Sequence, residues 1–233
     1  MTSSPAPDGA YVWIWLPGAV SPVVGGRLAR SDGQLLFNYG QSYLHRPDAI
    51  SIYAPELPLR SGVLPLQPGL AMSGCIRDAS PDAWGRRVLA NKRLGRNRDE
   101  GGHADLDELA YLLESGSDRI GALDFQTSPA TYAPRLAGNA PLHDLLEAAA
   151  LVEQGKPLQS DLNMALQHGS SLGGARPKVL LEAEERKYIA KFPAAADIRN
   201  VVKAEFVAMR LAAEAGLDVA PVKLTSALGK DVL

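Results

Sequence analysis

The segment at residues 169–178, with the sequence GSSLGGARPK, constrains the fold of this chain more than any other. Its consecutive small residues Gly173, Gly174 and Ala175 allow the backbone to take positive φ angles and to approach a ligand closely. Two strand-like runs, a helical pattern and a third strand follow, at 178–182, 188–192, 199–215 and 219–225. The order of loop, strand, turn, strand, helix and strand predicts an α+β unit.

The residues before this segment predict a β-rich region with associated helices. Residues 1–9 are small, polar and proline-containing, as in a disordered tail. Four strand-like runs punctuated by glycine are expected to form a small antiparallel meander, at 11–16, 23–29, 34–39 and 50–53. Recurrent prolines over 55–69 indicate an extended connector. Helices are expected at 80–89, 105–115, 142–154 and 158–167, with a short return strand at 118–123.

The first of these helices has a strong start signal. Ser80 would cap it, and Pro81 would occupy its first position, where the missing N–H costs nothing. With a boundary between the two regions near 130–140, we predict an α+β chain in three parts. These are a disordered tail over 1–9, a small antiparallel β-rich N-terminal subdomain with helices over 10–135, and a second domain over 136–233.

Composition and charge exclude several kinds of partner and site. The formal net charge of -2 gives no electrostatic reason to expect direct contact with nucleic acid or an anionic membrane. Cys75 is the only cysteine, which excludes an internal disulfide framework and a cysteine-rich zinc site and suits a reducing compartment. The histidines are scattered without metal-ligand spacing. No signal peptide or apolar run of membrane-spanning length is present, so we expect a soluble cytoplasmic protein without a metal site.

Three kinds of ligand-binding loop could explain the glycine-rich segment. A P-loop would need Lys and Ser or Thr where Ala175 and Arg176 stand, and a helix rather than a strand after it. A nucleophile elbow matches the letters GSSLG at 169–173, but it would need a strand before it and a helix after it. A kinase-like glycine loop between strands, lying over a nucleotide, fits the context. The remaining alternative is a turn that merely needs glycine.

A lysine and a glutamate in the following elements favour the kinase-like interpretation. Lys191 lies in an otherwise apolar strand, and a hairpin turn at 184–186 would place it roughly opposite Val179. A charge on a buried strand needs a partner, and Glu205 near the start of the next helix offers one. A kinase-type site uses such a lysine for nucleotide phosphates and such a glutamate to orient it. The alternatives are a solvated edge-strand lysine and an exposed helical glutamate.

Several motifs, in the same order, resemble those of HipA-family serine/threonine kinases. The runs SLGGARPK at 171–178, YIAKFP at 188–193 and AEF at 204–206 are similar to the kinase N-lobe of that family. The run IRDASPDAWGRR at 76–87 resembles the family's "LPDxWGrr" signature, although Ala79 and Ser80 stand where a Leu is usual. The run DRIGAL at 118–123 resembles its "DRxGAL" element. The resemblance covers nearly the whole chain and implies a protein-kinase-like N-lobe after the β-rich subdomain.

The resemblance implies roles for individual residues. Lys191 would hold the phosphates of ATP, with Glu205 orienting it, and Ser171 would be an autophosphorylated serine that expels the loop and switches the kinase off. The complete implied ATP-binding set is Gly173, Gly174, Ala175, Lys178, Lys191 and Glu205. The implied cofactor is ATP with Mg. The implied partners are a DNA-binding antitoxin and protein substrates of the translation apparatus, notably aminoacyl-tRNA synthetases.

The hinge, the catalytic Asp/Asn loop and the metal-binding Asp of the family are expected beyond Leu233, so the C-lobe and all catalytic residues should be absent from this chain. We therefore expect the nucleotide-binding and regulatory portion of a HipA-like kinase toxin, inactive alone and with weak or absent ATP binding. Such a chain would be a truncated product or one part of a split kinase. The alternative is a non-catalytic interaction module that binds a cognate antitoxin or a separately encoded catalytic half.

Overall fold

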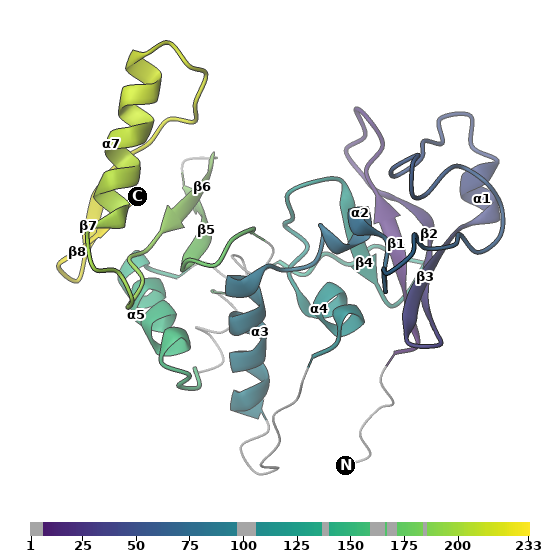
Figure 1. Cartoon of the computed structure of the whole chain (residues 1–233), viewed down its shortest axis with the longest axis horizontal. Coiled ribbons are helices and arrows are strands. Elements are labelled where there is room, and N and C mark those ends of the chain that lie inside the picture. Colours follow the sequence, from purple (N-terminus) through teal and green to yellow (C-terminus); the bar gives the residue numbers. More distant parts are fainter. Residues whose placement is uncertain (1–6, 97–105, 137–139, 159–165, 167–171, 184–185) are drawn as a thin grey trace. The chain divides into compact units, whose positions relative to one another are not determined.

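The computed structural model describes residues 7–96, 106–136, 140–158, 166, 172–183 and 186–233 of the chain (Figure 1). They form two compact units, each assembled from separate stretches of sequence. The first unit comprises Met1–Ser80 and Leu106–Arg135, and the second comprises Pro81–Asp105 and Leu136–Leu233. Both units combine helices with antiparallel strands, so the predicted α+β class is confirmed.

The first unit is built on a four-stranded antiparallel sheet in the order β3-β2-β1-β4. The strands are β1 (Gly9–Ile14), β2 (Val23–Ser31), β3 (Gln34–Tyr39) and β4 (Leu123–Gln126). Short helices accompany them: α1 (Gln41–Leu44), α2 (Gly74–Arg77) and α4 (Glu108–Glu114). Alternate side chains of the strands are buried, as the two-residue period of a strand requires. They pack with side chains of α2 and α4 in a core that includes Val12, Leu28, Phe37, Ile76, Leu109, Leu112 and Phe125.

The strand predicted at 50–53 does not form, because tyrosine hydroxyls satisfy its backbone. The Ile52 N–H donates to the Tyr39 hydroxyl (2.9 Å). The Tyr43 hydroxyl donates to the Ile50 carbonyl (2.8 Å). A backbone whose polar groups are bonded in this way needs no neighbouring strand. The chain instead makes a turn with one isolated bridge.

The fourth strand of the sheet is β4, which pairs with β1. It begins at Leu123, the last residue of the return strand predicted at 118–123. The predicted tail at 1–9 is too long, because Gly9 already pairs with Ala29 of β2. The first six residues of that tail lie outside the described part of the chain.

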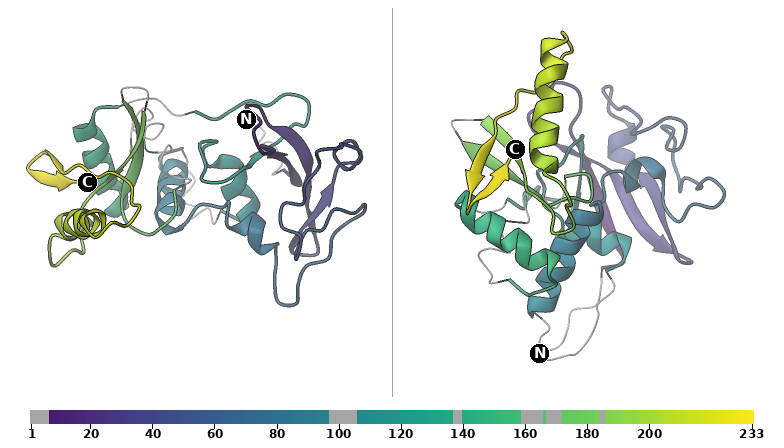
Figure 2. Two further views of the ribbon diagram at one scale, coloured as in Figure 1. Left: turned by 90° about the horizontal axis from the view of Figure 1, so that it is seen from above. Right: turned by 60° about the vertical axis from the view of Figure 1, so that its left-hand side comes forward.

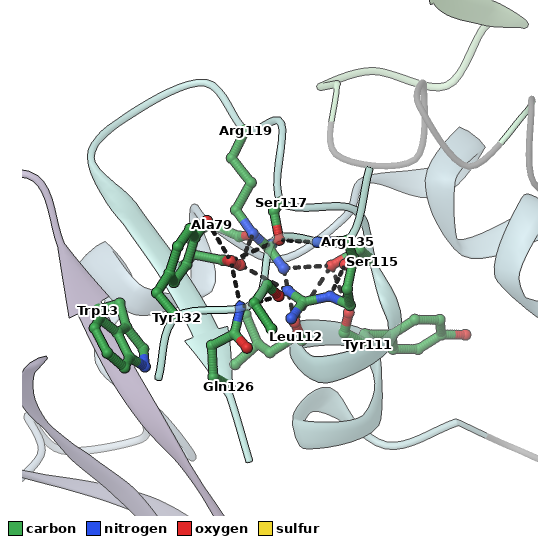
Figure 3. A network of polar contacts seen from close by, with 12 residues as sticks. Trp13, Ala79, Tyr111, Leu112, Ser115, Ser117, Arg119, Gln126, Tyr132 and Arg135 are labelled. Carbon is green, nitrogen blue, oxygen red and sulfur yellow. Dashed lines mark hydrogen bonds and ion pairs between the residues drawn. The ribbon is translucent and has the colours of Figure 1, made fainter. Parts of the chain in front are cut away.

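A buried polar network ties β4 to the segments around it (Figure 3). The Asp124 carboxylate is fully buried and accepts hydrogen bonds from Arg119 (3.0 Å) and Arg135 (2.7 Å). The Arg119 side chain is 2% exposed and also donates to the carbonyls of Ala79 and Leu112. Further donors to the Asp124 carboxylate are Ser117, Gln126 and Tyr132. Because the buried charges are paired and multiply hydrogen-bonded, the network fixes these segments to the strand.

The second unit packs helices and hairpins around its own core. Its elements are α3 (Ala83–Arg96), α5 (Leu142–Glu153), β5 (Lys178–Ala183), β6 (Arg186–Lys191), α7 (Val201–Glu214), β7 (Thr225–Ala227) and β8 (Lys230–Val232). The β5–β6 and β7–β8 pairs are antiparallel hairpins. Figure 2 shows the β7–β8 hairpin beside the start of α7, where Asn200 donates to Asp231 (2.5 Å). The core includes Trp84, Val88, Leu145, Leu146, Ala149, Val152, Val179, Phe192 and Val232.

The position of α3 differs from the predicted organisation. The prediction placed this helix in the subdomain over 10–135, whereas its contacts assign it to the second unit. The helix also begins at Ala83 rather than after a Ser80 cap. The Ser80 hydroxyl instead donates to Glu108 (3.1 Å) within the first unit.

The strand predicted at 219–225 is also wrong, since only its last residue, Thr225, belongs to a strand. Pro221 has no N–H to give to a ladder, which weakens strand pairing in this run. The helix expected at 158–167 lies mostly outside the described residues. Among the residues that the structure describes, no helix is both long and apolar enough to cross a membrane.

Candidate functional site

The β5–β6 hairpin brings two lysines side by side next to the glycine-rich segment. Its register pairs Lys178 directly with Lys191. The sequence predicted Val179 opposite Lys191, and the register differs by one residue because pairing continues as far as Ala183 and Arg186. Directly paired residues of an antiparallel hairpin point to the same face. The two lysines therefore share one face of the hairpin.

Lys191 donates to Glu205 of α7, and the two side chains form an ion pair. The side chains are 39% and 34% exposed, so the pair lies at the surface of the unit rather than in its core. The start of α7 is fixed by Asn200, whose side chain accepts from the Lys203 N–H (2.8 Å). Val202 is buried in the first turn. These two anchors hold the helix where Glu205 reaches the lysine on β6.

Lys191 does not lie on an open strand edge, which was the alternative for this residue. Its strand pairs with β5 on one side. On the other side the Lys191 N–H donates to the Leu233 carbonyl (2.8 Å), and the Leu233 N–H donates to the Lys191 carbonyl (3.2 Å). The backbone of Lys191 is therefore bonded on both sides, and its ammonium is directed to a carboxylate.

Lys178 is buried at the base of the glycine-rich segment. The residue is 8% exposed, and its ammonium donates to the carbonyl of Gly173. Burial lowers the pKa of Lys178, and the positive charge of Lys191 lowers it further. The carboxylates of Asp82 and Glu205 act in the opposite direction. A partly desolvated cation that is repelled by a like charge gains stability from a bound anion, so this face of the hairpin suits an anionic ligand.

Gly174 takes a backbone conformation that requires glycine. Its φ is +101°, and a Cβ atom there would lie 2.7 Å from the Lys178 ammonium nitrogen. Its N–H donates to the Asp82 carboxylate (2.6 Å), and its carbonyl accepts from the Trp84 N–H (3.2 Å). The residues on either side, Gly173 and Ala175, are exposed. Gly174 is thus held on both of its backbone polar groups by residues at the start of α3, while the residues on either side of it are exposed.

The roles of Asp82 and Trp84 beside the glycine-rich segment were not predicted from the sequence. Trp84 is fully buried, and its indole N–H donates to the Lys178 carbonyl (2.9 Å). The only available signal was the PDAW motif itself. The contacts of these two residues join positions 92 and 94 residues apart, so no local pattern could predict them.

The remaining predicted site residue, Ser171, lies outside the described residues. Arg176, in the described part of the segment, forms an ion pair with Asp197. Within the described residues no group of three or more His, Cys, Asp or Glu side chains could hold a metal ion. A cavity of about 500 Å³ in the second unit is lined from α5, the start of α7 and the β7–β8 turn, and neither Lys178 nor Lys191 lines it.

Comparison with known families places the chain in a protein class. The family described as HipA N-terminal domain matches residues 17–126, and the family described as HipA-like C-terminal domain matches residues 170–233. The chain belongs to the HipA family. Neither the curated proteins nor the solved structures gave a match. Lys178, Lys191 and Glu205 fall within the second matched region, whereas Asp82 falls within the first.

Proposed function

We propose that this chain is the nucleotide-binding and regulatory portion of a HipA-like serine/threonine protein kinase toxin. Its residues 136–233 would then be a protein-kinase-like N-lobe. The observation that carries the proposal is the pairing of Lys178 with Lys191 beside a glycine-rich segment, with Glu205 bonded to Lys191. Protein kinases use a strand lysine, a helix glutamate and a glycine-rich loop in these relative positions. Membership of the HipA family supports the same assignment.

In this proposal the site binds the phosphates of ATP, which with Mg would supply the phosphoryl group. Lys191 neutralises phosphate charge, and Glu205 holds its ammonium in place. Lys178 contributes a second positive charge on the same face. Gly173, Gly174 and Ala175 let the backbone approach the phosphates. Phosphorylation of Ser171 would regulate the site by adding about -1.5 to -2 charges to the segment.

The proposal assigns neither a catalytic base nor a metal ligand to this chain. In this proposal the chain alone transfers no phosphate, because phosphoryl transfer needs both groups at the γ-phosphate. Its ATP binding is weak, because a kinase binds adenine between its two lobes and the proposal assigns only one of them to this chain. The complete kinase would pair with a DNA-binding antitoxin and act on a protein of the translation apparatus.

A titration of the purified chain with Mg-ATP tests the nucleotide site. We expect a dissociation constant in the high micromolar range or weaker, corresponding to about 5 kcal/mol of binding free energy at most. Lys191→Met should abolish this binding. The substitution keeps the aliphatic stem but removes the positive charge that would neutralise the phosphates. Lys187→Met is the matched control: Lys187 lies on the same strand, is 56% exposed and pairs with Glu182.

Three results would argue against the assignment. Tight ATP binding that survives Lys191→Met would place the nucleotide elsewhere. Equal losses in the Lys191 and Lys187 variants would indicate a non-specific charge effect. Incorporation of labelled phosphate by the chain alone would show that it carries a catalytic base after all.

A second candidate function is a non-catalytic interaction module. It is favoured by the solvent-facing side of α7, where Val207 and Leu211 are 52% and 63% exposed. Ala204 and Ala208 lie on the same side at helical spacing and are exposed too. Such a stripe fits contact with an antitoxin or a separately encoded catalytic half. This function needs no nucleotide, so the ATP titration separates the two candidates.

A further inference from the structure

Asp82 places a carboxylate on the backbone of the glycine-rich segment. Its Oδ2 atom lies 2.6 Å from the Gly174 nitrogen and accepts the hydrogen bond from that N–H. A Cβ atom added at Gly173 would lie 3.1 Å from the same oxygen. The carboxylate thus occupies the side of the segment that glycine leaves open.

A carboxylate in this position does what a phosphate oxygen would do. Both are anionic oxygen acceptors, and a backbone N–H has a single proton to donate. Sharing that proton would bring two negative charges within a few ångströms of each other, where they repel one another. The Gly174 N–H can therefore serve Asp82 or a nucleotide phosphate, but not both.

The rest of the contact allows an exchange of one anion for the other without refolding of the segment. The Gly174 carbonyl is bonded to the Trp84 N–H (3.2 Å), and Trp84 is itself fixed by its indole bond to Lys178 (2.9 Å). These bonds do not involve the Asp82 side chain. A change of the Asp82 side-chain rotamer would free the Gly174 N–H, while the Gly174 carbonyl stays bonded to Trp84 and the Gly173 carbonyl to the Lys178 ammonium.

We propose that Asp82 is a positioning residue that holds the Gly174 N–H and gives it up to the phosphate chain of a bound nucleotide. Asp82 and phosphate compete for the Gly174 N–H, and this competition lowers the affinity of the site for phosphate. This inference rests on the proposed nucleotide site. In addition, Asp82, which belongs to the first matched region (residues 17–126), would set the affinity of the second matched region (residues 170–233) for phosphate.

Two substitutions separate competition from simple support. Asp82→Asn keeps an oxygen acceptor for the Gly174 N–H but removes the charge, and Asp82→Ala removes both. Competition predicts that both variants bind inorganic tripolyphosphate and ATP on the order of tenfold more tightly than the unaltered chain, because a charge-assisted bond no longer has to be broken. The gain should shrink at high salt. Glu182→Gln removes one exposed charge from β5 and should leave the affinity unchanged.

A spectroscopic measurement on the unaltered 233-residue chain tests the same exchange without any variant. Tripolyphosphate should shift the amide resonance of Gly174 and the carboxyl carbon resonance of Asp82 with one common midpoint. A shift at Gly174 without one at Asp82 would overturn the inference.

The affinities distinguish failure of this inference from failure of the proposed function. If the unaltered chain binds in a manner that depends on Lys191, while Asp82→Asn binds no more tightly, Asp82 only supports the segment and the inference is wrong. If no protein binds phosphate and the Gly174 amide never responds, the nucleotide site is wrong and the inference falls with it.

Discussion

At the scale of single residues, Asp124 is a buried carboxylate shared by two arginines. Arg119 and Arg135 both donate to its Oδ1 atom, and the Arg119 side chain is 2% exposed. Removal of one partner from a buried ion pair leaves an uncompensated charge, which costs about 3–5 kcal/mol. We expect Asp124→Asn to lower the free energy of unfolding by about 3 kcal/mol or more, measured by urea denaturation.

The pH dependence of stability provides a second measurement on the same variant. Burial raises the pKa of Asp124, but the charges of Arg135 and Arg119, with hydrogen bonds from Ser117 and the Phe125 backbone, lower it to below its ordinary value in the folded state. A lowered pKa stabilises the fold above the unfolded-state value of about 3.9, and this contribution is lost as pH falls through the folded-state value. The unaltered chain should therefore lose more stability below pH ~4 than Asp124→Asn does. The exposed ion pair of Asp48 with Arg46 is the control, and Asp48→Asn should have little effect on the free energy of unfolding or on its pH dependence.

Single residues also show which parts of the candidate site the sequence could predict. Lys191 and Glu205 are 14 positions apart on consecutive elements, so periodicity and order were enough to bring them together. Asp82 and Gly174 are 92 positions apart and belong to different matched family regions. Their contact depends on how α3 packs, which no local pattern encodes. Local spacing can predict contacts between consecutive elements, whereas long-range contacts can be identified only from the three-dimensional structure.

At the scale of elements, the strands that were predicted correctly are those with both alternation and a turn signal. β3 begins and ends where the sequence predicted, and β2 follows the predicted run closely. The run at 50–53 has strand-forming residues, but Tyr39 and Tyr43 supply the hydrogen bonds that a neighbouring strand would otherwise supply. β-propensity describes how well a side chain fits on a sheet, and it does not ensure that a neighbouring strand is available for pairing.

Trp84 links α3 to the hairpin that carries both lysines. Its side chain is fully buried, and its indole N–H donates to the Lys178 carbonyl (2.9 Å). Trp84→Phe keeps an aromatic ring but leaves that buried carbonyl without this donor, which costs about 1–3 kcal/mol. We expect Trp84→Phe to lower the urea midpoint without changing the m-value. Hydrogen exchange should speed up more in β5 than in the sheet of the first unit, each compared with the unaltered chain.

Trp15→Phe serves as the comparison for this prediction. Trp15 is only half-buried and belongs to the first unit, where its ring contacts Tyr132 at 5.3 Å between centroids. Its effect on β5 should be negligible. Equal exchange rates in β5 for both tryptophan variants would show that the indole bond does not hold the hairpin.

At the scale of the whole molecule, neither unit is a continuous piece of sequence. The chain passes from the first unit to the second after Ser80, returns at Leu106 and leaves again after Arg135. The sequence boundary near 136 coincides with the last of these crossings. The other two lie within the predicted subdomain over 10–135, because α3 buries its apolar face against α5 and the β5–β6 hairpin. The packing identifies these two crossings.

The discontinuity predicts how fragments of the chain should behave. Residues 136–233 alone lack Trp84 and Val88, two buried members of the core of the second unit. Loss of large buried side chains costs several kcal/mol, a large share of the 5–15 kcal/mol by which a domain is typically stable. This fragment should therefore bind a hydrophobic dye and unfold without a cooperative transition. Residues 81–105 joined to 136–233 by a flexible glycine-serine linker should unfold cooperatively in urea, and Trp84→Ala in that protein should abolish the gain. A cooperative transition of 136–233 at the same midpoint as the joined protein would instead support the boundary predicted from sequence.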